Sequence, residues 1–379
     1  MHVLFIGIGE NNLYENIGGS LDRHLRYTLR IGQCSTILIN RKVKLQNKTF
    51  GNFSVYPTNS ASLIKILWNS VILLKKIYRK DKIDIISCQD PFITATIGLF
   101  GKFILGIPLH IQNHSSFIDN QTWIHERPLL FKILNFIAKI NIGLADRLRV
   151  VNSDEKAIYI SKLKINANKI DVAPVPIDAD FWKNSLDDQE LQKFKKKFGL
   201  ENKKITLGWA GRFVQFKNIP LLFEIVSKLN KNKIQLIMAG NNNESFYNLN
   251  ELVEKYSIEP IFTGLLGKDE LRCFYKSLDI YIHTSNYEGF GLVVGDALAN
   301  GIPVISTNVA GSRDLIKHSK NGFISKNIGE FINYINLLVE NSELRSEMAN
   351  NALSFANGEL NYNAMEDKVI NSILKTLEK

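Results

Sequence analysis

Short apolar runs alternate with stretches of helical periodicity along the whole chain of 379 residues. Runs of about four to eight residues rich in Ile, Val, Leu and Phe, bounded by polar or glycine-containing turns, are typical of buried strands. The first half contains six such runs, at 2–8, 35–40, 83–88, 108–112, 147–151 and 170–174. The second half contains five, at 204–210, 233–240, 260–264, 279–284 and 302–307. Helical stretches lie between most of these runs, which predicts an α/β protein with two parallel sheets covered on both faces.

The chain length also favours two domains, because one hydrophobic core rarely serves a chain of this size. A proline-containing segment, 172–185, separates the two strand–helix series. We therefore expect a first domain at 1–175 and a second at 176–359, with an amphipathic helix within 360–379 packing back on the first domain. The predicted fold class is two doubly wound Rossmann-like domains facing a cleft that is lined by the carboxyl ends of both sheets.

Two long apolar stretches need separate treatment. Residues 92–111 approach the length of a membrane span, but Lys102 lies centrally and a Gly-Ile-Pro sequence interrupts the run. This pattern favours a buried helix followed by a strand. Residues 62–80 form an apolar helix with basic residues in its last turns. The second pattern fits a core helix whose basic end complements the helix dipole, and it also fits an interfacial helix on anionic lipid.

The charge is unevenly distributed in an otherwise ordinary globular composition. The net charge is +10, and residues 1–180 hold 23 Lys and Arg against 14 Asp and Glu. A basic first half indicates an anionic partner, and an anionic membrane surface fits better than a nucleic acid, because no recognisable nucleic-acid module is present. Three scattered cysteines and an N-terminal strand in place of a signal peptide predict a cytoplasmic protein, with peripheral contact to the inner face of the cytoplasmic membrane left open.

The segment NYEGFGLVVGDALANG, 286–301, carries the clearest candidate chemistry. Glycines precede a helix expected to begin near Phe290 or Gly291, and a helix N-terminus after glycines is an anion site. Asp296 lies roughly 7–8 Å further along this helix. This separation matches that between the phosphates and the ribose of a nucleotide, so Asp296 could accept hydrogen bonds from the ribose hydroxyls. Glu288 would face the group that the phosphate carries. The alternative is a turn glutamate and a solvated helix carboxylate.

Other strand ends in the second half present matching groups. Arg212 and Lys217, in the loop GRFVQFKN, suit a diphosphate, although a solvated basic loop explains them as well. Backbone groups, an apolar wall for a flat base and a hydroxyl follow at the next strand ends, from Gly264, Leu265, Leu266 and Ser285. Because the carboxyl ends of parallel strands share one edge of a sheet, these groups together predict a nucleotide site.

The second half resembles the donor domain of the retaining glycosyltransferases of family four, which have the GT-B fold. GRFVQFKN is similar to their G-R-x-x-x-x-K-G loop, with Asn218 in place of glycine. Residues 285–307 resemble their E-x7-E segment and the strand after it, with Asp296 in place of the second glutamate. The resemblance covers residues 200–355 and continues more weakly over 1–180. It implies an enzyme that uses a nucleotide-sugar, retains the anomeric configuration and requires neither a metal nor another cofactor.

The resemblance also implies roles for individual residues. Arg212 and Lys217 would hold the diphosphate and stabilise the leaving group, and Glu288 would bind sugar hydroxyls. Asp296 would bind the ribose through a shorter side chain, with Gly295 permitting a closer approach. The phosphate would meet the amides of Phe290, Gly291 and Leu292.

In the first half, two features resemble parts of an acceptor site. Gly18 and Gly19 precede a helix starting near Ser20 and are similar to the family's glycine-rich acceptor loop, although a plain helix cap explains them equally well. His114, at a strand end, resembles the family's sugar-contacting histidine, against the alternative of a loop histidine bonded to nearby backbone.

The remaining histidines and one acidic motif complete the inventory. Of the seven histidines, His110 is expected in the core, and His24, His125 and His283 at the surface or in packing contacts. The D-x-D sequence at 178–180 is rejected as a metal site, because it lies in the linker and matches the family's interdomain segment.

The sequence therefore predicts a retaining glycosyltransferase that moves a sugar from a UDP- or GDP-sugar to a glycan or lipid-linked acceptor in cell-surface polysaccharide or glycoconjugate biosynthesis. The first domain would bind the acceptor and the second the donor. Two alternatives remain open. One is a nucleotide-sugar epimerase of the same fold, which should show additional titratable groups in the cleft. The other is a non-catalytic nucleotide-sugar-binding relative, for which Asp296 is the only support.

Overall fold

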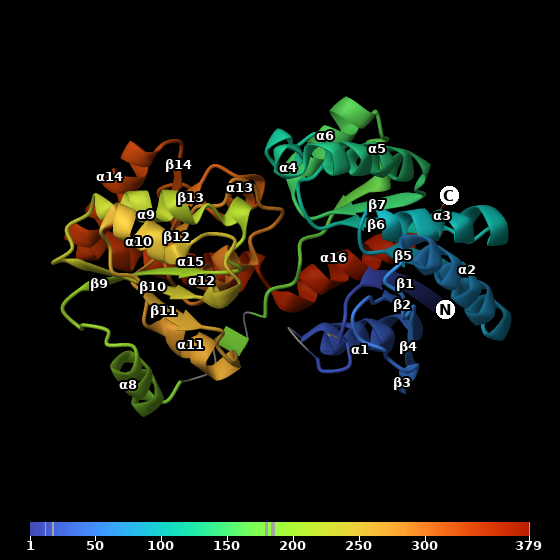
Figure 1. The fold of residues 1–379 in the computed structure, drawn as a ribbon, viewed down its shortest axis with the longest axis horizontal. Coiled ribbons are helices and arrows are strands. Elements are labelled where there is room, and N and C mark those ends of the chain that lie inside the picture. The colour runs from blue at the N-terminus through green and yellow to red at the C-terminus, as the bar shows by residue number, and fades with distance from the viewer. Residues whose placement is uncertain (12, 17–18, 179–180, 183–185, 379) are drawn as a thin grey trace. The chain divides into compact units, whose positions relative to one another are not determined.

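The chain folds into two α/β units, each with its own sheet (Figure 1). The computed structural model describes residues 1–378 except 12, 17–18, 179–180 and 183–185. The first unit comprises Met1–Pro174 and Glu366–Lys379, and the second comprises Val175–Met365. The prediction of two Rossmann-like α/β domains is confirmed, and the C-terminal segment returns to the first unit, starting later than the predicted 360.

The first unit holds an eight-stranded sheet in the order β3-β4-β2-β1-β5-β6-β7-β8. All neighbouring strands are parallel except β3 and β4, which pair antiparallel at one edge. The strands are β1 (His2–Ile8), β2 (Gln33–Ile39), β3 (Lys48–Phe50), β4 (Phe53–Pro57), β5 (Ile85–Cys88), β6 (Leu109–Asn113), β7 (Arg147–Val150) and β8 (Ile170–Val172). The pattern of apolar runs predicted all of these strands except β3 and β4. β3 was missed because two of its three residues are exposed.

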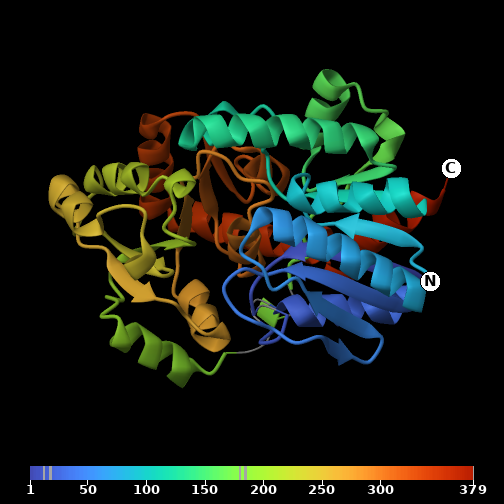
Figure 2. The ribbon, with the colours of Figure 1, turned by 45° about the vertical axis from the view of Figure 1, so that its right-hand side comes forward.

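Helices cover both faces of this sheet, and β1 shows how the sequence separates the faces. Leu4 and Ile6 point into one core cluster, whereas Val3 and Phe5 point into the other. The helices are α1 (Ser20–Ile31), α2 (Leu63–Lys80), α3 (Ile93–Leu105), α4 (Gln121–Glu126), α5 (Pro128–Leu144) and α6 (Ser153–Leu163). α2, α3 and α5 pack on the Leu4 side, where Figure 2 shows them one below the other, and α1 packs on the Phe5 side.

The two long apolar stretches, 62–80 and 92–111, form elements of the first unit. Residues 92–111 form α3 followed by β6, as predicted. α2 buries Ile66, Leu74 and Ile77 in the core, which supports the core interpretation for its inner face. Within the described residues, we find no helix with the length and hydropathy needed to cross a membrane.

The last helix, α16 (Tyr362–Leu374), completes the first unit's second core cluster with Val369, Ile370 and Ile373. Its buried carboxylate, Glu366, pairs with Arg26 at 3.1 Å and Arg30 at 3.6 Å. These contacts are made at the far end of the sequence from the strands that they cover, so the C-terminal segment is a structural part of the first unit.

The second unit holds a six-stranded parallel sheet in the order β11-β10-β9-β12-β13-β14. The strands are β9 (Ile205–Ala210), β10 (Ile234–Ala239), β11 (Ile261–Gly264), β12 (Ile280–His283), β13 (Val304–Thr307) and β14 (Gly322–Ser325). The helices are α8 (Asp188–Lys197), α9 (Ile219–Ser227), α10 (Leu249–Tyr256), α11 (Lys268–Lys276), α12 (Leu292–Ala299), α13 (Ala310–Leu315), α14 (Ile328–Glu340) and α15 (Ser342–Glu359). The short edge strand β14 was not predicted.

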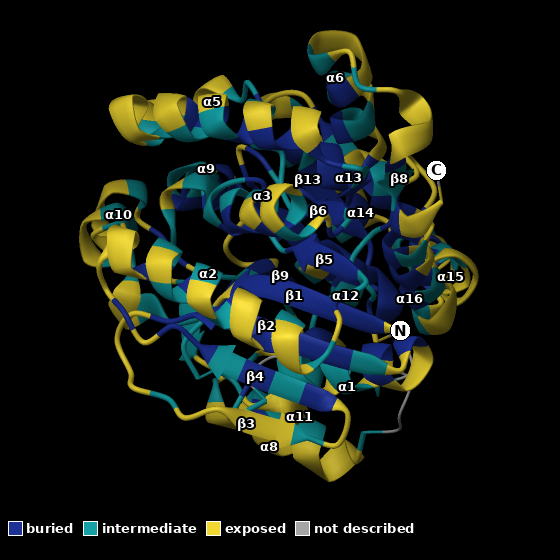
Figure 3. Ribbon diagram, turned by 90° about the vertical axis from the view of Figure 1, so that its right-hand side faces the viewer, coloured by how far each residue is buried: buried dark blue, intermediate teal, exposed yellow. Residues whose placement is uncertain are grey.

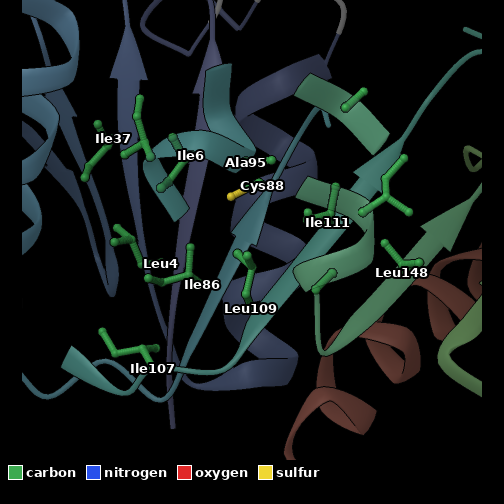
Figure 4. Packing of buried hydrophobic residues seen from close by; sticks show 14 of the residues in the cluster. Leu4, Ile6, Ile37, Ile86, Cys88, Ala95, Ile107, Leu109, Ile111 and Leu148 are labelled. Carbon is green, nitrogen blue, oxygen red and sulfur yellow. The ribbon is translucent and has the colours of Figure 1, made fainter. Parts of the chain in front are cut away.

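α3 lies unusually close to β5 because glycines face the sheet. A Cβ on Gly98 would lie 2.5 Å from the Sγ of Cys88 and 2.6 Å from Cδ1 of Leu109. Both side chains belong to the packed core that Figure 4 shows, and the thiol of Cys88 donates to the carbonyl of Thr94. The core at this point has no room for an additional methyl group.

We therefore expect Gly98→Ala to lower the free energy of unfolding by about 1–3 kcal/mol, because overpacking outweighs the helix propensity of alanine. Gly143→Ala on α5 is the matched control, since its Cβ would meet no atom within 4 Å. The control should be neutral or stabilising by up to about 1 kcal/mol. Urea unfolding followed by circular dichroism measures both, and equal effects would contradict the packing argument.

Candidate active site

The second unit's sheet reverses its strand order between β9 and β12, which are neighbours although β10 and β11 separate them in the sequence. In open α/β sheets, ligands bind beside the carboxyl ends of the strands at such a switch point. The loop after β9 carries Arg212 and Lys217, and the loop after β12 carries Ser285 and Glu288. The strand order thus places both loops at one edge of the sheet.

The loop after β9 lies against the end of β10 because two glycines meet there. A Cβ on Gly240, which has a φ of +147°, would lie 2.0 Å from the carbonyl oxygen of Gly211. The loop ends at Asn218, which has a φ of +50° and accepts a hydrogen bond from the amide of Leu221 at the start of α9. Asparagine enters this left-handed region more readily than most residues. This backbone conformation explains why asparagine can occupy the position at which the G-R-x-x-x-x-K-G loop has its last glycine.

A cavity of about 660 Å³ lies at the same edge of the sheet. Its wall brings together four residues singled out from the sequence: Arg212, Leu265, Leu266 and Asp296. The other lining residues are Ala210, Gly211, Phe213, Val214, Ala239, Gly240, Asn241, Glu244, Leu271, Tyr275 and Val293. The volume falls within the range of about 300–1,000 Å³ that is usual for small-molecule sites. A positive φ at Gly264 turns the chain at the end of β11 just before the two leucines.

Arg212 is the cation of this cavity. Its side chain is exposed, and no carboxylate among the described residues pairs with it. A guanidinium in this position can bind an anion with two parallel hydrogen bonds.

Lys217, in contrast, is buried and paired. Its Nζ lies 2.5 Å from Oε2 of Glu288, so the ion pair joins the loop after β9 to the loop after β12. Neither residue lines the 660 Å³ cavity in the described part of the chain. Burial alone would raise the pKa of Glu288, but the hydrogen bond from His283 and the charge of Lys217 outweigh burial and lower this pKa to about 2. Glu288 is therefore ionised at neutral pH.

His283 is a site residue that the sequence analysis missed. It is the last residue of β12 and is almost fully buried, with Nε2 3.5 Å from Oε2 of Glu288 and 2.9 Å from Oγ of Ser285. Its Nδ1 lies 2.9 Å from Oγ of Ser306 on β13. Burial lowers the pKa of His283 although Glu288 opposes that shift, so the imidazole is neutral at pH 7. The sequence signal for this role was the position of His283 at the end of an apolar strand. The sequence analysis took that position to indicate a packing residue.

Asp296 has the opposite protonation behaviour. Burial raises its pKa to about 7, although a hydrogen bond from Trp182 works against this shift. The indole N–H of Trp182 donates to Oδ1 of Asp296 over 3.0 Å, and the ring packs edge-on against Tyr275. The segment that the sequence predicted as a linker therefore supplies a hydrogen-bond donor to the only carboxylate of α12.

The structure gives Gly295 a packing role, and its expected role beside a ribose stays a prediction. A Cβ on this residue would lie 2.0 Å from Cδ1 of Ile177, so the glycine makes room for the segment that contains Ile177. Ile177 is buried, and Trp182 follows it at the same helix. The packing reason for a glycine in the middle of α12 is thus the passage of the interdomain segment.

The start of α12 agrees with the sequence prediction. Gly291 has a φ of +83° and precedes the first helical residue, Leu292. The amide of Gly311 donates to the carbonyl of Glu288, and a Cβ on Gly311 would lie 2.5 Å from the backbone of Phe290. α13 therefore fixes the glycine-containing turn from behind. The first-turn amides of a helix have no partner within the helix, so this end can meet an anion.

Ser285 is placed differently from the other predicted binding residues. It is fully buried, it lies on a separate cavity of about 310 Å³ with Asn286 and Thr307, and its hydroxyl contacts His283. Its position fits a support for His283 better than a contact with a nucleotide.

In the first unit, the glycine pair precedes α1 as expected. Gly19 has a φ of +66°, and Gly18 lies outside the described residues. The side-chain oxygen of Asn16 accepts hydrogen bonds from the amides of Leu21 and Asp22 at 3.0 and 3.2 Å. This end of α1 is thus capped by a side chain of the preceding loop, which is the plain-cap alternative.

His114 follows β6 and its Nε2 lies 3.3 Å from the side-chain oxygen of Gln89. Burial, and then the charge of Arg149, hold the pKa of His114 well below its usual value. His110 is fully buried between Ser87 and Ser372, as predicted for a core residue.

The D-x-D sequence of the linker falls partly outside the described residues, which omit 179 and 180. Asp178 accepts a hydrogen bond from the amide of Phe181 at 2.9 Å. Among the described residues, no group of three or more His, Cys, Asp or Glu could hold a metal ion. The absence of a metal requirement stays a prediction.

Two family models match the chain. Glycosyl transferases group 1 matches residues 190–355, and Glycosyltransferase Family 4 matches residues 40–181. Among solved structures, Anabaena HepE in complex with UDP-glucose has a TM-score of 0.78 over 100% of both chains, at 17% identity. The lipopolysaccharide outer core galactosyltransferase WaaB has a TM-score of 0.70 over 100% of both chains, at 18% identity. The fold is therefore that of the GT-B glycosyltransferases.

Curated relatives agree with the family models. A glycosyltransferase of Methanocaldococcus jannaschii is 26% identical over 64% of this chain, and the chain covers less than two thirds of that protein, 62%. The UDP-Gal:alpha-D-GlcNAc-diphosphoundecaprenol alpha-1,3-galactosyltransferase of Escherichia coli is 26% identical over 73% of this chain and 71% of that enzyme. The GDP-mannose-dependent alpha-mannosyltransferase of Corynebacterium glutamicum is 30% identical over 39% of this chain and 35% of that enzyme. The two matched segments are thus those of glycosyltransferase domains, with residues 190–355 matching group 1 and residues 40–181 matching Family 4.

The buried ion pair gives a stability prediction. Lys217→Met leaves the carboxylate of Glu288 buried without its cation, which should lower the free energy of unfolding by about 3 kcal/mol. The double variant Lys217→Met/Glu288→Gln removes that charge and should recover most of the loss. Urea unfolding at pH 7 tests both variants, and a double variant no more stable than the single one would contradict a charge effect.

Proposed function

We propose that this chain transfers a sugar from a UDP- or GDP-sugar to a glycan or a lipid-linked acceptor, with retention of configuration. The observation that carries the proposal is the 660 Å³ cavity at the switch point, whose wall combines Arg212, Leu265, Leu266 and Asp296. A nucleoside diphosphate needs a cation, an apolar wall and a hydrogen-bond acceptor in this combination. The names of the relatives are consistent with the proposal, since they specify UDP-Gal with a diphosphoundecaprenol acceptor in one case and GDP-mannose in another.

The helix α12 sets the distances along the bound donor. With the diphosphate at the amides of Phe290, Gly291 and Leu292, Asp296 lies roughly 6–9 Å further along the chain at helical rise. This spacing suits the ribose, and the base then lies against Leu265 and Leu266. Arg212 binds the diphosphate from the side of β9.

The transferred sugar lies toward Glu288. Its carboxylate is ionised at neutral pH, so it can accept hydrogen bonds from sugar hydroxyls. The Lys217–Glu288 ion pair opens when donor binds, because both partners then gain new ones: Lys217 binds the phosphate, and Glu288 binds the sugar. His283 holds Glu288 in place during this exchange.

In the transfer step, the bond between the anomeric carbon and the phosphate oxygen breaks, and a bond to the acceptor oxygen forms on the same face. The acceptor proton passes to the departing phosphate, so no protein nucleophile is needed. Negative charge grows on the diphosphate, and Arg212 and Lys217 stabilise that charge more strongly in the transition state than in the ground state. No metal is required, because these cations and the start of α12 supply the positive charge.

The first unit binds the acceptor in this proposal, with His114 and the loop of Gly18 and Gly19 as contacts. The basic character of residues 1–180 suits an acceptor that carries phosphate. The nucleotide-sugar epimerase alternative is not favoured, since the relatives named above by their activity are transferases.

A thermal-shift panel of UDP-, GDP- and ADP-sugars tests the donor class directly. A ligand at about 100 times its dissociation constant adds about 2.7 kcal/mol to the stability of the folded state. No shift with any of the three classes would contradict the proposal.

Turnover should depend on the two cations. Arg212→Ala and Lys217→Ala should each lose roughly 10²–10³ in kcat, because each removes a contact to the group that gains charge as the bond breaks. Lys228→Ala, at an exposed ion pair between the residue after α9 and Glu224 on α9, is the control and should keep full activity. Release of nucleoside diphosphate measures all three. Wild-type turnover in Arg212→Ala or Lys217→Ala would contradict the assignment.

Substitutions of Asp296 and Glu288 should affect different steps, nucleotide binding in one case and sugar transfer in the other. Asp296→Asn should weaken the binding of free UDP or GDP by about 1.5–3 kcal/mol. Glu288→Gln should leave the binding of free nucleotide unchanged and lower the rate of sugar transfer. Because the pKa of Asp296 is about 7 and its ionised form is the better acceptor, nucleotide affinity should rise up to about tenfold from pH 6 to pH 8. Titration calorimetry at pH 6, 7 and 8 measures the nucleotide affinity of the wild type and of Asp296→Asn. If the affinity of the variant still rises with pH, a group other than Asp296 is responsible.

A further inference from the structure

α5 has an inverted distribution of polar and apolar residues. A surface helix ordinarily buries its apolar side and exposes its polar side. The buried residues of α5 include Asn135 and Asn141. Asn141 donates to the carbonyls of Pro91 and Phe92 at 2.8 and 3.0 Å, and Asn135 donates to Asp119 at 3.0 Å. α5 is therefore held partly by hydrogen bonds, and its apolar residues are left for the outside.

The outer side of α5 carries an apolar strip along its whole length. The strip residues lie three or four positions apart and are 41–79% exposed: Leu129, Ile133, Phe136, Ile140 and Leu144. Residues at this spacing share one face of a helix. Exposed positions recur on the outer side of α5, α3 and α2 in Figure 3.

The neighbouring helices extend this strip. α3 exposes Phe100, Phe103 and Ile104, and α2 exposes Leu63, Ile64, Trp68 and Ile72. α2 packs against α3, and α3 packs against α5, so the three helices form one layer. They contain 13 of the 24 exposed large apolar side chains among the described residues. This concentration exceeds the scattered exposure that is normal for a monomer and indicates an interaction surface.

The charge of the same layer is of one sign. α2, α3 and α5 contain no Asp or Glu, and their eight basic residues are Lys65, Lys75, Lys76, Arg79, Lys80, Lys102, Lys132 and Lys139. Lys102 and Lys139 pair with carboxylates of the adjoining loops. The other six leave a net positive layer, and four of them lie at the end of α2.

The apolar strip and the positive charge together indicate which partner covers this face. A second copy of the chain would bring like charges together across a two-fold interface. A lipid surface with anionic headgroups accommodates both features, because apolar side chains enter the acyl boundary and lysines pair with phosphates. We propose that the outer face of α2, α3 and α5 docks on an anionic lipid bilayer. This docking is independent of the donor site in the second unit.

Trp68 makes the proposal measurable. It is 69% exposed, whereas the three other tryptophans, Trp123, Trp182 and Trp209, are at most 5% exposed. Vesicles of phosphatidylcholine with phosphatidylglycerol should shift the intrinsic fluorescence of the full chain to the blue, and vesicles of phosphatidylcholine alone should shift it much less. Trp68→Phe should lose the shift but still float with anionic vesicles.

Flotation of variants separates the two contributions. Lys75→Ala/Lys76→Ala should lower partitioning roughly thirtyfold at low salt, and the loss should fade as salt rises. Phe136→Ser should lower partitioning at every salt concentration. Leu29→Ser on α1, at an 86% exposed position, and Lys193→Ala/Lys196→Ala on α8 are matched controls and should float like the wild type.

Several outcomes would overturn the proposal. One is equal flotation of Phe136→Ser and Leu29→Ser, and another is flotation indifferent to lipid charge. Light scattering that shows a dimer in solution, dissociated by Phe136→Ser, would assign the face to a second copy. Nucleotide thermal shifts of Phe136→Ser should match those of the wild type, so a failure of docking is distinguishable from a failure of the donor assignment.

Discussion

The ion pair between Lys217 and Glu288 connects the two loops that flank the sheet's switch point, and the arrangement of the second unit's site depends on it. Without a cation beside it, burial would raise the pKa of the Glu288 carboxyl group. Lys217 and His283 keep it ionised, while eight residues further on the surroundings of Asp296 favour the protonated form. One segment thus holds two carboxyl groups with widely separated pKa values. Separation of this kind is a feature of functional sites.

The linker contributes to the same site. Ile177 occupies the space that Gly295 leaves on α12, and Trp182 donates to the carboxyl group of Asp296. A residue that would bind the ribose therefore also contacts the segment at the start of the second unit. Under the proposed function, a nucleotide bound at Asp296 would therefore share this carboxyl group with Trp182.

Most of the fold followed from the sequence because buried parallel strands are short continuous apolar runs, and all eleven predicted strands are present. The strands that were missed, β3, β4 and β14, lie at or next to a sheet edge, where exposure or shortness weakens this signal. At the site, the predicted cavity residues Arg212, Leu265, Leu266 and Asp296 do come together. The partners of His283 and the reason for Gly295 could not be predicted, because both depend on contacts between residues distant in sequence. The exposed strip of α5 was hidden for a related reason: an apolar helix with two asparagines does not reveal which side faces the core.

The asparagine contacts of α5 have a consequence for how this surface can change. In most helices the residues that specify position are the apolar ones, so altering them alters the fold. In α5, Asn135 and Asn141 contribute to its position through directional bonds to Asp119, Pro91 and Phe92. The outer residues therefore carry less of the folding constraint and can drift in sequence with comparatively little repacking of the domain. Evolution, or a designer, could retune the affinity of this face for its surroundings while the sugar-transfer machinery stays as it is.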